Sequence, residues 1–88
     1  MKKHILFTFH ADQKLVVLRH HGFHLVKEDI ERMLTYPLRV RAGYKDRKVA
    51  EGDLTSEHSV RIVYEEGENE LRVITLYPVR ISRYENKL

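Results

Sequence analysis

The sequence of 88 residues contains no cysteine, only two prolines, and four glycines that stand singly. The lack of cysteine excludes a disulfide-stapled scaffold, a thiolate zinc site and a cysteine nucleophile, and it suits a reducing cytoplasm, where we expect the protein. No apolar run approaches the ~20 residues that a membrane span needs, and residues 1–10 lack the apolar core of a signal peptide. There is no phosphate-binding glycine loop, nucleophile elbow or dinucleotide-binding motif.

What the chain does contain is typical of one small folded domain. Hydrophobic residues make up 42% and charged residues 33% of the sequence, which favours a soluble globular protein over a disordered chain. Compact domains usually have ~100–150 residues, so we expect a single domain over residues 1–88.

The net charge of +3 is unevenly distributed along the chain. Residues 1–27 carry +4, residues 28–56 are balanced, residues 57–70 carry −4 and residues 71–88 carry +3. If the two basic ends meet in space, they form a basic patch for which anionic partners are plausible. The alternative is scattered, solvated charge.

The first half of the chain predicts a short strand followed by two helices. Aromatic and β-branched residues predict a strand over 5–9. Apolar residues at helical spacing predict a helix over 10–21, which Gly22 ends. A second helix over 26–36 has acids in its first turns and ends before Pro37.

The second half switches to the period of two that is typical of strands. We expect strands from residue 38, within 44–51, and over 58–65 and 71–77, with a loop at 52–56 and a hairpin at 66–69. Pro78 is expected to interrupt the last strand, so that 79–84 forms a kinked extension or an edge strand. The order predicts an α+β fold, with a short N-terminal strand and a two-helix hairpin packed on an antiparallel β-meander.

Three segments of this chain resemble the RelE/ParE superfamily of small toxin-like proteins. They are the arginine-bearing strand Ser59–Tyr64, the apolar strand Leu71–Tyr77, and the closing Arg80–Tyr84, in which a tyrosine follows a basic residue by four positions. The opening Phe9–Ala11, with Arg19 downstream, is similar to an uncharacterised RelE-like branch whose first helix begins with a His-Ala pair. The likeness spans roughly residues 7–84.

The resemblance implies a metal-independent endoribonuclease that cleaves messenger RNA, often on the ribosome, needs no cofactor and is held inactive by an antitoxin. By motif, Arg61 matches the central-strand arginine, Arg80 the closing basic residue and Tyr84 the terminal tyrosine. Pro78 and a longer segment between the helices depart from the pattern. ParE-like relatives keep the fold and act on gyrase without cutting RNA, so the fold alone leaves activity open.

RNA cleavage by the 2′-OH needs a base, a group that stabilises charge on the phosphate, and an acid. Arg61 and Arg80 suit the phosphate, because the guanidinium meets its oxygens bidentately. His10 is the natural acid or base near pH 7. Tyr84 is a candidate to orient the sugar, donate a proton or stack on a base.

Each of these residues also has a structural interpretation. Arg61 is equally suited to an ion pair with a nearby acid, and Arg80 with Tyr84 to an exposed sheet edge. His10 is equally suited to capping a helix. The outlying basic residues either contact a nucleic-acid backbone or are solvated: Arg19, Lys45, Arg47, Lys48 and Arg83.

We expect no metal site. His20 and His24 have the spacing of two ligands on one helix face, but Gly22 is expected to end the helix between them. His21 lies beside them, and no third ligand is marked elsewhere.

Two other functions remain open at this stage. One is a non-catalytic module of the same fold that binds a protein or a nucleic acid. The other is a homo-oligomer, such as a homodimer, in which edge strands near 38–40 or 79–84 pair between copies.

Overall fold

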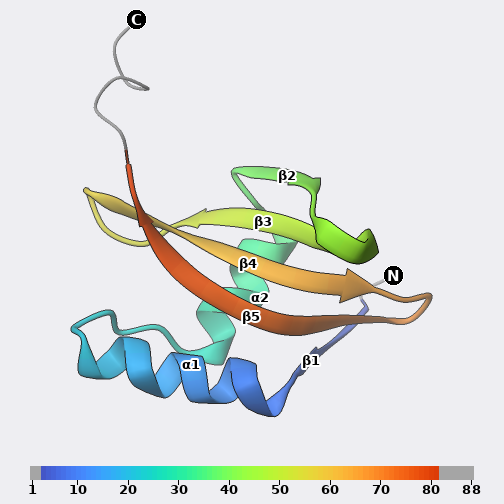
Figure 1. Cartoon of the computed structure of the whole chain (residues 1–88), viewed down its shortest axis with the longest axis horizontal. Coiled ribbons are helices and arrows are strands. Elements are labelled where there is room, and N and C mark those ends of the chain that lie inside the picture. The colour runs from blue at the N-terminus through green and yellow to red at the C-terminus, as the bar shows by residue number, and fades with distance from the viewer. Residues whose placement is uncertain (1–2, 82–88) are drawn as a thin grey trace, which may run out of the picture.

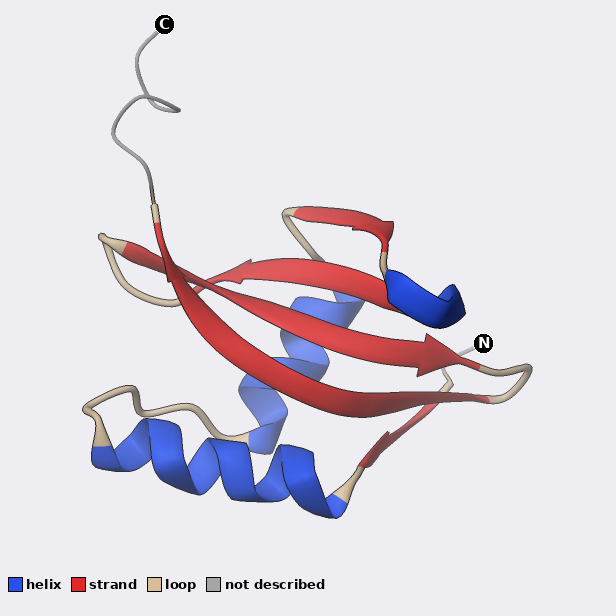
Figure 2. Cartoon of the chain, viewed as in Figure 1, coloured by secondary structure: helices blue, strands red, loops and turns tan. Residues whose placement is uncertain are grey.

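The computed structural model describes residues 3–81, which form two helices and a five-stranded sheet (Figures 1 and 2). In chain order the elements are β1 (His4–Phe7), α1 (Phe9–His20), α2 (Lys27–Thr35), β2 (Arg39–Ala42), the 3-10 turn η1 (Tyr44–Asp46), β3 (Lys48–Asp53), β4 (His58–Glu66) and β5 (Glu70–Arg80).

Both helices begin at residues that satisfy free backbone N–H groups. The Thr8 hydroxyl accepts a hydrogen bond from the Ala11 N–H at 3.1 Å, which caps α1. The Asp29 carboxylate accepts from the Val26 N–H at 3.0 Å at the start of α2. Gly22, with φ of +90°, takes the left-handed conformation after α1, as the sequence predicts.

The strands are arranged in the order β1-β5-β4-β3-β2. Strands β2 to β5 form an antiparallel meander, and β1 pairs parallel with the first part of β5. The predicted α+β fold is therefore confirmed. The parallel pairing of β1 also brings the N-terminal segment beside the last strand (Figure 1).

The core lies between the helices and one face of the sheet. Its buried members come from both helices, the connecting segment and strands β4 and β5: Ala11, Leu15, Leu18, Leu25, Ile30, Met33, Val60, Ile62, Val73 and Leu76. In Figure 1, α2 passes behind the sheet and α1 follows the border formed by β5. The opposite face of the sheet carries no helix among the described residues, and we call it the uncovered face.

Several boundaries differ from the sequence prediction: β1 ends at Phe7 and not at Phe9, and Tyr44–Asp46 is a 3-10 turn and not part of a strand. The last strand continues through Pro78, which lies opposite Val60, because a proline is tolerated where its missing N–H falls on the outer side of a sheet edge. Gly52 belongs to β3 and not to the following loop. It is buried against Met33, where a side chain would find no room.

Between Lys3 and Ile81, no helix is long and apolar enough to cross a membrane.

Candidate functional site

Arg61 lies in the middle of the uncovered face. Its neighbours in β4, Val60 and Ile62, are fully buried in the core, so the alternation of the strand turns Arg61 the other way. The residues opposite it are Glu51 in β3 and Tyr77 in β5. Cross-strand partners share a face, so all three side chains belong to the uncovered face.

A β-bulge decides which residue of β5 accompanies Arg61. The register of β4 and β5 shifts by one residue between Val63 and Tyr64. Without this shift, the pairing that begins at Glu66 and Leu71 would place Leu76 opposite Arg61. The bulge therefore keeps Leu76 in the core and brings Tyr77 beside the arginine.

The carboxylate of Glu51 organises the polar groups beside Arg61. It is only 13% exposed, accepts a hydrogen bond from the Ser59 hydroxyl at 2.8 Å and forms an ion pair with Nε of Arg39 at 3.0 Å. Nε of Arg61 is buried and has no hydrogen-bond partner among the described residues. Because Nε is buried, a ligand of the uncovered face would meet the terminal nitrogens of this half-buried guanidinium.

The start of α1 brings His10 to the border of this face. Its Nε2 lies 3.0 Å from Oγ1 of Thr75. Thr75 lies opposite Val63, which, like Arg61, faces away from the core. Thr75 and Tyr77 are alternate residues of β5. Arg61 and Tyr77 therefore lie opposite each other on the uncovered face, and His10 reaches its border at Thr75; we call these three residues the His–Arg–Tyr set.

Arg80 does not join this region. It lies opposite His58, three residues before Arg61, so the two arginines are on opposite faces of the sheet. Its guanidinium is 4.0 Å from the carboxylate of Glu57, and both side chains are strongly exposed. The expected convergence of Arg61 and Arg80 is therefore wrong. Tyr84 and Arg83 lie outside the described residues.

Most of the other basic candidates are engaged in local contacts. Arg47 binds the Glu65 carboxylate at 3.2 Å, Lys48 binds Glu66, and Lys45 lies over the ring of Tyr44 at 5.7 Å. Arg19 is exposed at the end of α1. Arg47 lies at the end of the uncovered face, because its partner Glu65 is on the same face of β4 as Arg61, but its charge is paired there.

The two basic ends of the chain do lie together, but local acids balance much of their charge. Lys27 pairs with Asp12 at 3.2 Å and Arg72 with Glu70 at 3.1 Å. The charges of Lys27 and Arg72 are therefore paired, and these two residues do not contribute to the basic patch that the charge distribution makes plausible.

Nothing in the sequence marks Tyr77 as a site residue. A tyrosine in an apolar strand reads as a core or edge residue, and its placement depends on the bulge. The one available signal is that Tyr77 and Arg80 are three residues apart. In a strand, an odd separation puts two side chains on opposite faces, so only one of the two can share a face with Arg61.

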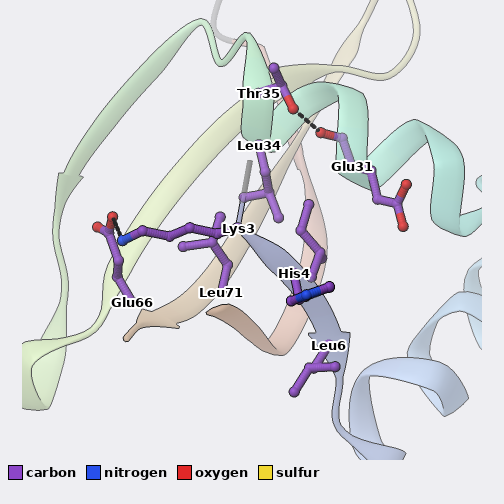
Figure 3. Close-up of a pocket in the computed structure, with 9 residues that line it drawn as sticks. Lys3, His4, Leu6, Glu31, Leu34, Thr35, Glu66 and Leu71 are labelled. Carbon is purple, nitrogen blue, oxygen red and sulfur yellow. Dashed lines mark hydrogen bonds and ion pairs between the residues drawn. The ribbon is translucent and has the colours of Figure 1, made fainter. Parts of the chain in front are cut away.

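A groove lies at the end of the sheet, between α2 and β1 (Figure 3). It has a volume of about 750 Å³, with Leu34 and Leu71 among its apolar walls. At its border, Glu66 accepts hydrogen bonds from Lys3 at 2.6 Å and from Lys48. These two ammonium groups lower the pKa of Glu66 to about 2, and the bond to Glu66 raises the pKa of Lys48. None of the His–Arg–Tyr set lines this groove.

Over residues 3–81, no three histidine, aspartate or glutamate side chains come together as metal ligands. Comparison of the chain with protein-family models, with curated proteins and with solved structures finds no match.

Proposed function

We propose that the protein is a cytoplasmic, RelE-like endoribonuclease that cleaves messenger RNA without a metal ion, and that His10, Arg61 and Tyr77 carry the reaction. The observation that supports this is the position of a guanidinium opposite a phenol on the uncovered face, with an imidazole at the border of that face beside Thr75. These are the three kinds of group that phosphodiester transfer needs.

The proposed step uses the 2′-OH of the RNA as the nucleophile. Neutral His10 removes the 2′ proton, and the oxygen attacks the adjacent phosphorus. Arg61 donates hydrogen bonds to the phosphate oxygens as negative charge grows on them. The P–O5′ bond breaks, and the Tyr77 hydroxyl gives its proton to the leaving oxygen. The products are a 2′,3′-cyclic phosphate and a 5′-hydroxyl, and the proton on His10 returns to Tyr77 through solvent.

Control of this activity by an antitoxin belongs to the same proposal, and rests on the resemblance of the sequence to RelE/ParE proteins. A bound protein would have to cover the uncovered face or hold RNA away from it.

The test is cleavage of free and ribosome-bound RNA in the presence of a metal chelator. We expect His10→Ala to lower the rate about 10²–10⁴-fold, because an acid–base group is lost, and Arg61→Ala to lower it about 10²–10³-fold. Tyr77→Phe removes only the hydroxyl and tests proton donation. Arg32→Ala is the matched control, because this exposed arginine pairs with Asp29 on α2, away from the uncovered face.

The Arg80→Ala variant distinguishes the site inferred from the strand register, which leaves Arg80 out, from the site inferred from the family motif, which includes it. The motif predicts a loss as large as that of Arg61→Ala, whereas the placement of Arg80 on the other face predicts nearly full activity. Equal losses from both variants would overturn the His–Arg–Tyr set. RNA binding without any cleavage by the native chain would overturn the nuclease and favour the binding module.

A further inference from the structure

Strand β2 forms one border of the sheet, and its outer edge pairs with no strand of the described chain. All four of its residues are exposed. Leu38, just before the strand, is 59% exposed and Val40 is 45% exposed. An edge with unpaired backbone groups and apolar side chains is a template for a further strand.

The surface is hollowed near both ends of β2. One hollow of about 220 Å³ is lined in part by Tyr36 and Leu38. The other, of about 390 Å³, is lined in part by Arg41, Arg47 and Lys48. An added strand would therefore have a recess near each end: the first mixes apolar residues with Arg32 and Asp53, and the second carries three cations and one acid, Asp46.

The charges of β2 indicate what kind of strand fits. Arg39 and Arg41 project to the uncovered face, opposite Glu51 and Val49 of β3. Glu51 binds Arg39 at 3.0 Å, but Arg41 has no acidic side chain within 4.0 Å in the part of the chain that the structure describes. An acid on an incoming strand would give Arg41 the partner that Glu51 gives Arg39.

A second copy of β2 is a poor occupant of this edge. If two β2 strands pair antiparallel about Val40, Arg39 of each copy lies opposite Arg41 of the other. If they pair in parallel register, each arginine meets its own equivalent. Like charges opposite each other destabilise a sheet, so homotypic pairing at this edge is disfavoured.

We propose that β2 binds an extended acidic segment of another protein, which joins the sheet as a sixth strand. Alternate acidic side chains face Arg39 and Arg41, and the apolar ones between them lie with Leu38 and Val40. Backbone hydrogen bonds hold the segment, and the arginines select its charge. RNA offers no such row of peptide groups, so an extended peptide fits this edge better.

Arg39 and Arg41 share the uncovered face with Arg61, but the outer edge of β2 lies two strands away from β4, and no residue of β2 belongs to the His–Arg–Tyr set. The two proposals therefore fail independently. A catalytically inactive protein can still bind the acidic segment, and an active one can lack this interaction.

The test uses the full chain and a peptide of alternating glutamate and valine residues. We expect the peptide, at concentrations up to about 1 mM, to shift the amide NMR signals of β2 and to protect them from hydrogen exchange. The same peptide with lysine in place of glutamate should not do so. A peptide with alternate backbone amides methylated should lose binding, because it cannot complete the ladder of hydrogen bonds.

Arg41→Glu should weaken binding of the acidic peptide about tenfold, since it removes one cross-strand attraction and adds one repulsion. Arg19→Glu makes the same change of charge on α1 and should leave the affinity unchanged. No response of β2 at any concentration tested, or equal binding of the lysine or methylated peptide, would overturn the proposal. The proposal would also be overturned if β2 were protected by dimerisation of the protein itself, or if oligouridylate displaced the peptide from β2.

Discussion

At the residue scale, the contact between Gly52 and Met33 shows how closely β3 and α2 approach each other. A Cβ added at Gly52 would lie 2.6 Å from Cγ and 2.7 Å from Sδ of Met33. Such distances force the methionine or the backbone to move. A loop is the usual expectation for an isolated glycine followed by Asp53, but here the missing side chain makes room for the helix.

We expect Gly52→Ala to reduce the free energy of unfolding by about 1–3 kcal/mol, the usual cost of overpacking, with flexible Met33 absorbing part of it. Urea unfolding of both proteins measures the difference. Gly67→Ala is the control, because its nearest neighbours are 3.5 Å or more away and its φ is not positive. That change is expected to be neutral or slightly stabilising. Equal losses would show that the contact with Met33 is not responsible.

At the scale of the elements, Glu66 joins three segments at one end of the sheet. It ends β4, and its carboxylate binds Lys3 just before β1 and Lys48 at the start of β3. Its pKa falls from 4.5 to about 2 because both ammonium groups favour the ionised form. A group whose folded pKa is depressed stabilises the fold above its unfolded pKa and loses that effect as the pH falls.

The stabilisation by Glu66 should therefore be complete above pH 4.5 and decline as the pH falls toward 2. We expect the melting temperature of the native chain to fall more steeply between pH 4.5 and about pH 2 than that of Glu66→Gln. Glu31→Gln, an exposed change on α2, should keep the native slope. Parallel pH profiles for the native chain and Glu66→Gln would contradict this assignment.

The sequence predicts the elements well, because helix and strand periods and the terminal signals at Gly22 and Pro37 are local. What it does not predict is the lateral placement of strands. The bulge after Val63 moves the partner of Arg61 by one residue and thereby changes which side chains share its face. No residue type marks that position, so Tyr77 could not be selected from the sequence, and Arg80 was placed with Arg61 by motif alone.

At the scale of the whole molecule, the net charge of +3 does not show which cations are paired with acids and which are free to attract an anion. Lys3, Lys27 and Arg72 each have an acidic partner within 3.2 Å. Arg61, by contrast, forms no ion pair with an acidic side chain within residues 3–81. Attraction of a polyanion to this protein should therefore depend on a few cations more than on total charge.

Binding of single-stranded RNA provides a measurement at this scale. If Arg61 contacts one phosphate, Arg61→Ala should reduce the slope of log affinity against log salt by about 0.7. Fluorescence anisotropy between about 50 and 200 mM salt measures the slope. Arg32→Ala should keep the native slope, and an unchanged slope in Arg61→Ala would show that this arginine does not contact the phosphate backbone.

The proline of β5 has a consequence for assemblies of this protein. One border of the sheet consists of the short β1 and of the stretch of β5 that carries Pro78, with α1 packed beside β5. That border offers an arriving strand few donors, whereas β2 offers a complete edge. The sheet can therefore be extended in one direction only. A complex made through β2 should stop at one protein and one bound segment, and should not continue into a fibre.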